Sequence, residues 1–114
     1  MKKDVNIFLG HILESVETIE EHVHGMRKDD FMDSRMSQDA VIRRLEIIGE
    51  AVKNIPTPFR TAHPAVPWSG LAGMRDRLIH TYFSVDLELL WAIIKDELPK
   101  LKRQVQGLLK EIAQ

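Results

Sequence analysis

Five side chains that could do chemistry lie within eight residues of one another: Arg75, Asp76, Arg77, His80 and Tyr82. A histidine exchanges protons near neutral pH and can act as a general base or a general acid. An arginine stays charged and can grip a phosphate through two parallel hydrogen bonds. Metal-free RNA cleavage needs a base for the 2′-hydroxyl proton, an acid for the leaving oxygen and a cation for the phosphate. These residue types therefore make the segment a candidate site for phosphodiester chemistry.

Helical geometry sets conditions on this segment if it forms a straight helix. At about 100° per residue, Asp76 and His80 share a face, where the carboxylate can orient the imidazole. Arg75 and Tyr82 also share a face, but Arg75 and His80 point about 140° apart. This pair can meet at one phosphate if the helix is distorted near its end, if the arginine wraps round, or if two copies of the chain meet. We favour the dimer, because two copies of the pair would supply base, acid and cation.

A purely structural interpretation of the same residues is also open. Charged residues and a histidine on one helix commonly form a solvated, salt-bridged face, and aromatic residues near a helix end commonly anchor it in the core. The spacing alone leaves the segment a candidate.

The composition restricts the class of protein. The chain has 114 residues, of which 44% are hydrophobic and 29% charged, which is typical of one globular domain spanning residues 1–114. No apolar run approaches the roughly 20 residues of a membrane span, and the N-terminus lacks a signal-type apolar segment, so no membrane contact is expected. The absence of cysteine excludes disulfides and suits a cytoplasmic location.

The formal net charge of −1 argues against a general nucleic-acid coat protein, which would carry a clear basic excess. Any contact with RNA must then come from a few arginines and lysines gathered at one place.

Apolar residues at spacings of three and four predict amphipathic helices. We expect them over residues 4–24, 37–55, from about 68 to 79, and 87–112. Asp4 is the predicted N-cap of the first helix, and Pro99 predicts a kink or a break in the last. No segment alternates with a period of two, so no strands are predicted. The fold class is all-α, an up-and-down bundle of four to five helices.

Three local features sharpen this prediction. Gly49, in mid-helix, costs about 1 kcal/mol relative to alanine, which predicts close packing of another backbone. Phe59 and Trp68 are expected to pin an irregular stretch that contains Pro56, Pro58, Pro64 and Pro67. Residues 84–86 are expected to form a turn, with Asp86 capping the last helical region.

The spacing Arg75-x4-His80-x-Tyr82 resembles the signature of the HepT-like toxins of the HEPN superfamily. The resemblance covers nearly the whole chain in the expected order, including residues 3–5, 38–51, 67–68 and 72–87.

The resemblance implies a helical homodimer in which two copies of the segment line a shared cleft. It implies a metal-independent ribonuclease toxin with no cofactor, RNA as the substrate, and a minimal nucleotidyltransferase antitoxin as the partner. Arg75 and His80 would be catalytic, and Asp76 would support and orient them. Tyr82 would accept AMP from the antitoxin, which would block RNA by bulk and charge. Arg77 is a candidate for a further phosphate contact.

An alternative from a different class is a non-catalytic helical subunit that binds a nucleotide or a substrate for a nucleotidyltransferase. A purely structural helical protein is the remaining possibility.

A metal site is not expected at the other histidines. His22 and His24 lie about 200° apart on a helix, and Glu20 with His24 gives only two ligands. Glu46 and Glu50 are predicted to serve in salt bridges or an interface.

Overall fold

The computed structural model describes residues 4–81 and 84–114, and of His80 and Thr81 only the backbone. Its longer helices are α1 (Val5–Val23), α3 (Arg35–Asn54) and α8 (Leu98–Ala113). The shorter ones are α2 (Lys28–Met32), α4 (Thr57–Ala62), α5 (Trp68–Ala72), α6 (Met74–Leu78) and α7 (Leu87–Ala92), with a π-helical turn, η1 (Ile93–Glu97). Two strands, β1 (Ile79–Thr81) and β2 (Ser84–Val85), pair antiparallel.

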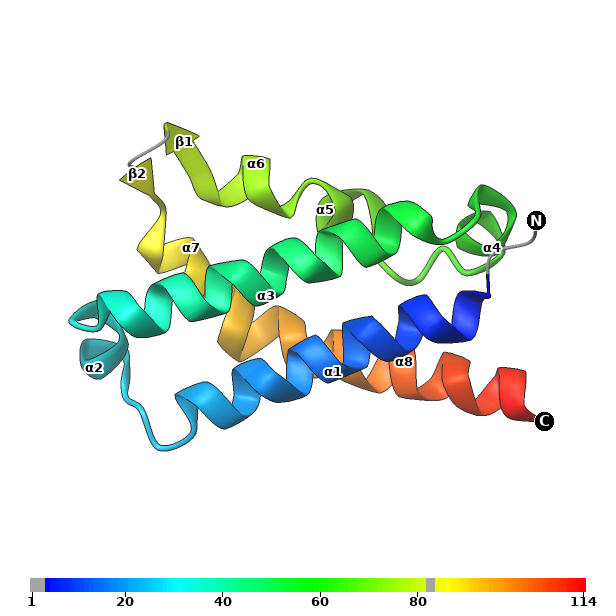
Figure 1. Cartoon of the computed structure of the whole chain (residues 1–114), viewed down its shortest axis with the longest axis horizontal. Coiled ribbons are helices and arrows are strands. Elements are labelled where there is room, and N and C mark those ends of the chain that lie inside the picture. The colour runs from blue at the N-terminus through cyan, green and yellow to red at the C-terminus, as the bar shows by residue number, and fades with distance from the viewer. Residues whose placement is uncertain (1–3, 82–83) are drawn as a thin grey trace.

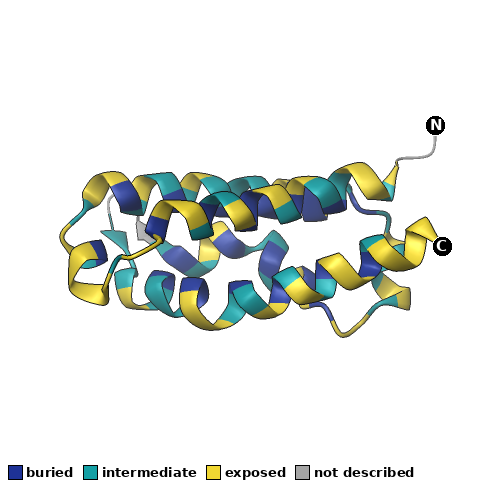
Figure 2. Cartoon of the chain, turned by 90° about the horizontal axis from the view of Figure 1, so that it is seen from below, coloured by how far each residue is buried: buried dark blue, intermediate teal, exposed yellow. Residues whose placement is uncertain are grey.

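The helices form an up-and-down bundle, which confirms the all-α class. The chain runs along α1, back along α3, forward again through α5 and α6, and back through α7, η1 and α8 (Figure 1). Helix α3 packs on α1 and on α5 and α6, and α8 also packs on α1. Figure 2 shows the buried positions turned inward between the helices. Within the described residues, no helix is long and apolar enough to cross a membrane.

The ends and the core face of α1 follow the prediction. The Asp4 carboxylate accepts a hydrogen bond of 2.9 Å from the Asn6 backbone N–H, which caps the helix. Gly25 follows the helix with φ of 79°, a conformation that glycine adopts without strain. The buried apolar residues of α1 recur at spacings of three and four, as the amphipathic pattern predicts: Leu9, Ile12, Val16, Ile19 and Val23.

The proline-rich stretch is more regular than predicted, because it contains α4. Pro58 lies in the first turn of this helix, where a missing N–H costs no hydrogen bond. The predicted anchors are confirmed: Trp68 is buried, and its ring packs edge-on against Phe59 at 6.4 Å. The Trp68 indole N–H also donates to the His63 carbonyl at 2.9 Å.

The last helical region is not one regular α-helix, as predicted: α7, η1 and α8 follow one another, and Pro99 lies in the first turn of α8. The residue before it, Leu98, keeps helical angles (φ −64°, ψ −39°) and donates its N–H to the Ile93 carbonyl, five residues back. This wider π turn ends just ahead of Pro99, so the helix accommodates the bulky ring and the missing N–H.

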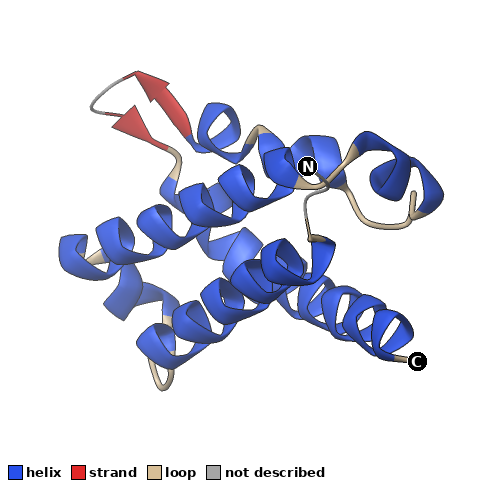
Figure 3. Cartoon of the chain, turned by 45° about the vertical axis from the view of Figure 1, so that its right-hand side comes forward, coloured by secondary structure: helices blue, strands red, loops and turns tan. Residues whose placement is uncertain are grey.

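The predicted third helix is divided in two, and its end is replaced by a hairpin. Gly73 separates α5 from α6, and the helix stops at Leu78. The prediction of no strands was wrong, and so was the turn at residues 84–86, since Ser84–Val85 forms β2. β-Branched Ile79, Thr81 and Val85 favour extended backbone. Figure 3 shows the two strands standing apart from the helices.

The cap predicted at the end of this hairpin is confirmed. The Asp86 carboxylate accepts from the Leu89 N–H at 3.0 Å and starts α7. The Asp86 N–H donates to the Leu78 carbonyl at 2.8 Å. This hydrogen bond joins the residue after β2 to the last residue of α6.

The close approach predicted at Gly49 is confirmed. A Cβ added there would lie 3.1 Å from the Leu71 carbonyl oxygen and 3.5 Å from that of Ala72. The glycine thus lets the backbones of α3 and α5 touch.

We predict that Gly49→Ala destabilises the protein by up to about 2 kcal/mol. The gain in helix propensity is about 1 kcal/mol, but overpacking against a backbone carbonyl costs roughly 1–3 kcal/mol. Urea unfolding at constant m-value measures the change. The matched control is Gly107→Ala in α8, where the new Cβ meets nothing within 4 Å, and we expect it to stabilise by roughly 0.5–1 kcal/mol. Equal stabilisation by both substitutions would contradict the packing argument.

Candidate active site

Arg75 projects from α6 with its side chain 70% exposed. Its Nη1 lies 3.6 Å from the Glu46 carboxylate on α3, and Glu46 is 34% exposed. This separation is longer than a good charge-assisted hydrogen bond, and ion pairs of this kind contribute about 1 kcal/mol or less. The contact therefore positions the Arg75 guanidinium but leaves its hydrogen-bond donors available, so that a phosphate could displace Glu46.

Arg75 opens onto a small hollow of about 130 Å³ between α3 and α6. The charged groups that line it are Arg43, Glu46, Glu50, Lys53 and Arg75. Lys53 Nζ lies 3.3 Å from the Glu50 carboxylate, so the predicted salt-bridge roles of Glu46 and Glu50 are confirmed. Three cations face two carboxylates here, a local positive excess in a chain of net charge −1.

His80 lies in β1 and not on a helix, so the predicted helical pairing with Asp76 was wrong. The Ile79 N–H donates to the Arg75 carbonyl, which completes the last turn of α6. Ile79 itself has an extended backbone (φ −108°, ψ 108°). Of the three routes that could bring Arg75 and His80 together, a distorted helix end is thus present in the backbone. Asp76 is exposed in the first turn of α6, and Tyr82 lies outside the described residues. The roles predicted for these residues remain predictions.

Arg77 makes the firmest polar contact near the site. Its Nη1 and Nη2 donate to the two Glu97 carboxylate oxygens at 3.1 and 2.7 Å. This hydrogen-bonded pairing raises the pKa of Arg77 despite the opposing effect of partial burial. The bridge joins α6 to η1, twenty residues further along the chain. A phosphate contact by Arg77 would have to compete with Glu97, and that contact also stays a prediction.

One histidine and one glutamate of α1 make polar contacts with other helices. His22 Nε2 lies 3.1 Å from the Ser37 hydroxyl, and Lys102 donates to Glu20 at 2.8 Å. Across the described part of the chain, no three histidine, aspartate or glutamate side chains gather as metal ligands would.

The fold and the site define a class of protein: a helical bundle with an exposed arginine one turn ahead of a short strand that holds a histidine. Comparison with known proteins gives the family. The sequence model of the family described as Ribonuclease HepT-like matches residues 12–108. The chain belongs to this family.

Two relatives show how far the similarity extends. A "Probable ribonuclease HepT" of Thermococcus cleftensis is 46% identical over 96% of this chain and 100% of its own length. A "Gamma-glutamylcyclotransferase and putative RNase" of Methanocaldococcus jannaschii is 52% identical over 98% of this chain, which spans only 50% of that relative. No solved structure matches the chain.

Proposed function

We propose that this protein is a metal-independent endoribonuclease and the toxin of a toxin–antitoxin pair. The observation that carries the proposal is Arg75, an exposed guanidinium in a cationic hollow with only a loose carboxylate partner. Membership of the HepT-like ribonuclease family supports it, as do the ribonuclease names of the relatives.

In the proposed reaction, the Arg75 guanidinium binds two non-bridging phosphate oxygens of RNA and stabilises the charge that grows there. The His80 imidazole accepts the proton of the neighbouring 2′-hydroxyl. The freed oxygen attacks phosphorus, and the bond to the 5′-oxygen of the next nucleotide breaks. A second acid protonates that leaving oxygen. Asp76 keeps a supporting role in this proposal, in which its carboxylate orients the imidazole across the end of α6 and not along one helix face.

We propose that a homodimer supplies the second acid. A histidine that has just accepted the 2′-hydroxyl proton would have to move it to the opposite side of phosphorus. A His80 from the partner subunit, already protonated, could act there directly. The end of α6 at Leu78 supports this assembly, because the chain beyond it leaves the bundle as a hairpin (Figure 3).

We also propose that a nucleotidyltransferase antitoxin silences the enzyme by transferring AMP from ATP to the Tyr82 hydroxyl, with release of pyrophosphate. Tyr82 is two residues after His80. The added phosphodiester carries a negative charge beside the cleft, so it would repel RNA and also fill the space that RNA needs.

The first prediction tests cleavage. Purified protein should cut single-stranded RNA in the presence of EDTA, and Arg75→Ala or His80→Ala should lower the rate by at least about 100-fold. Circular dichroism should show the same helical content in each variant. The control is Arg103→Ala on α8, an exposed arginine away from the site, which should leave the rate unchanged. Wild-type cleavage by His80→Ala would remove the catalytic assignment, and saturable nucleotide binding without cleavage would favour the non-catalytic alternative.

The second prediction tests the control by AMP. Incubation with the cognate nucleotidyltransferase and ATP should add the mass of AMP to the peptide that holds Tyr82, and RNA cleavage should fall in step. Tyr82→Phe should keep cleaving RNA and should not gain this mass. The mechanism is wrong if wild-type Tyr82 stays unmodified, or if the phenylalanine variant is silenced equally well.

A further inference from the structure

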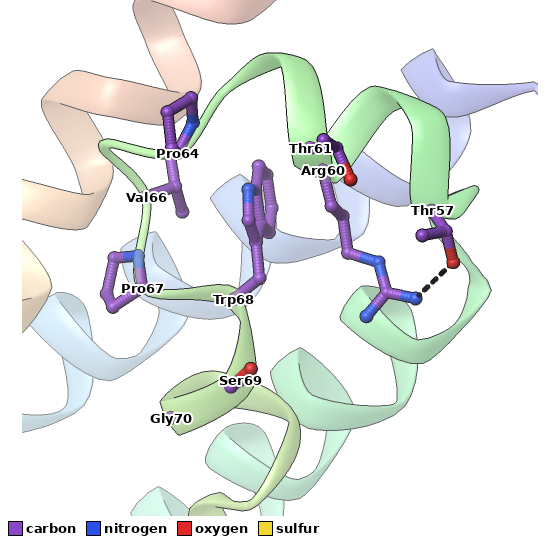
Figure 4. Close-up of a pocket in the computed structure, with 9 residues that line it drawn as sticks. All are labelled: Thr57, Arg60, Thr61, Pro64, Val66, Pro67, Trp68, Ser69 and Gly70. Atoms are coloured by element: carbon purple, nitrogen blue, oxygen red, sulfur yellow. Dashed lines mark hydrogen bonds between the residues drawn. The ribbon is translucent and has the colours of Figure 1, made fainter.

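A second hollow, of about 550 Å³, lies apart from Arg75, where α4 and the loop after it meet α5. Its polar lining comes from Thr57, Arg60, Thr61 and Ser69, and the segment that leads into Trp68 forms an apolar wall (Figure 4). Most of the lining residues are exposed, so the hollow is open to solvent and could admit part of a polymer.

Arg60 is unusual among the arginines of the described residues. Its Nη2 donates to the Thr57 hydroxyl at 3.2 Å, but its Nε is buried and has no hydrogen-bond partner. Within the described part of the chain it makes no ion pair, whereas Arg75 and Arg77 each face a carboxylate. A buried donor without a partner costs about 1–3 kcal/mol. The hydrogen bond to Thr57 therefore holds the guanidinium in place while not all of its N–H donors are used.

The chemistry around Arg60 fits a phosphate group. A guanidinium matches phosphate oxygens in a fork, and the hydroxyl-bearing residues Thr61 and Ser69 also line the hollow. No carboxylate lines the hollow, so nothing there would repel an anion. In Figure 4 the Arg60 guanidinium lies beside Thr57, and Trp68 and Ser69 lie to its left. The apolar wall could receive a ribose or the face of a base.

The hollow lies next to the Arg77 side of α6. Ser69 and Gly70, which line it, belong to α5, and α6 with Arg75 follows after one residue. A Cβ placed on Gly70 would lie 3.8 Å from Arg77 Nη1, so the Arg77–Glu97 bridge adjoins the floor of the hollow. An RNA strand that is bound at Arg75 and continues past α5 would meet a second cation at Arg60.

We propose that the Arg60 hollow binds a backbone phosphate of the RNA strand, a few nucleotides away from the phosphate that Arg75 holds. This inference rests on the proposed ribonuclease function, because that function makes RNA the ligand. An acidic side chain of a partner protein could also bind a guanidinium, and the experiment below separates the two.

The test measures binding of a 2′-O-methylated single-stranded RNA, which cannot be cut by attack of its own 2′-hydroxyl. Fluorescence anisotropy gives Kd for wild type and Arg60→Met over a series of KCl concentrations. Methionine keeps an unbranched apolar stem but removes the charge. We expect Kd to rise about tenfold and the slope of log K against log salt to shrink by ~0.7, the value for one phosphate contact on a single strand. The melting temperature should stay the same or rise, because an unsatisfied donor has been removed.

Two controls and three outcomes make the result decisive. Arg103→Met should change neither Kd nor the salt slope, and Arg60→Lys should keep most of the slope while losing the forked hydrogen bonds. Unchanged Kd and slope in a folded Arg60→Met protein would overturn the proposal, even if wild type cuts ordinary RNA. Loss of self-association or of antitoxin binding with intact RNA binding would also overturn it, in favour of an acidic partner. If wild type fails to cut ordinary RNA but Arg60→Met still lowers the salt slope, phosphate binding in the Arg60 hollow is supported and the ribonuclease proposal is wrong.

Discussion

The contact of two backbones at Gly49 is the constraint on which the rest of the site depends. With no side chain at that position, α3 approaches the carbonyl oxygens of Leu71 and Ala72 at the end of α5. Because α6 follows α5 after a single glycine, this contact also fixes where α6 begins. One side of α6 then places Arg75 beside Glu46 of α3, and the other places Arg77 on Glu97 of η1. A five-residue helix, too short to be stable alone, is held on two sides.

The short length of α6 also has a functional consequence. The spacing Arg75-x4-His80 suggested two positions on one helix, where the side chains would point apart. The helix instead ends at Leu78, and the hydrogen bond from the Asp86 N–H to the Leu78 carbonyl closes the hairpin that begins there. In extended backbone the rise per residue is about 3.3 Å instead of 1.5 Å, and the direction of successive side chains alternates. The geometry that made the pair look incompatible therefore does not apply.

Local signals made much of the fold predictable. The apolar spacing of α1 and α3, the caps at Asp4 and Asp86, and the close approach at Gly49 each depend on a residue type and its near neighbours, and each was confirmed. The hairpin could have been found from the β-branched residues that follow Leu78, but the helical period of residues 71–78 outweighed them. The pairing of Arg77 with Glu97 has no local signal, because it joins residues twenty positions apart. The unused bonding capacity of Arg60 depends on burial, which the sequence does not encode locally.

In the proposed mechanism, the catalytic unit is a pair of chains whose Arg75 and His80 meet in one cleft. The most direct measurement mixes Arg75→Ala protein with His80→Ala protein, unfolds and refolds them together, and assays RNA cleavage. Each variant alone should be inactive. The mixture should cleave faster than either parent but more slowly than wild type, because a mixed dimer holds one intact arginine and one intact histidine across its interface but lacks the second histidine. A mixture that stays as inactive as its parents, with mixed dimers shown by native mass spectrometry, would contradict the shared cleft.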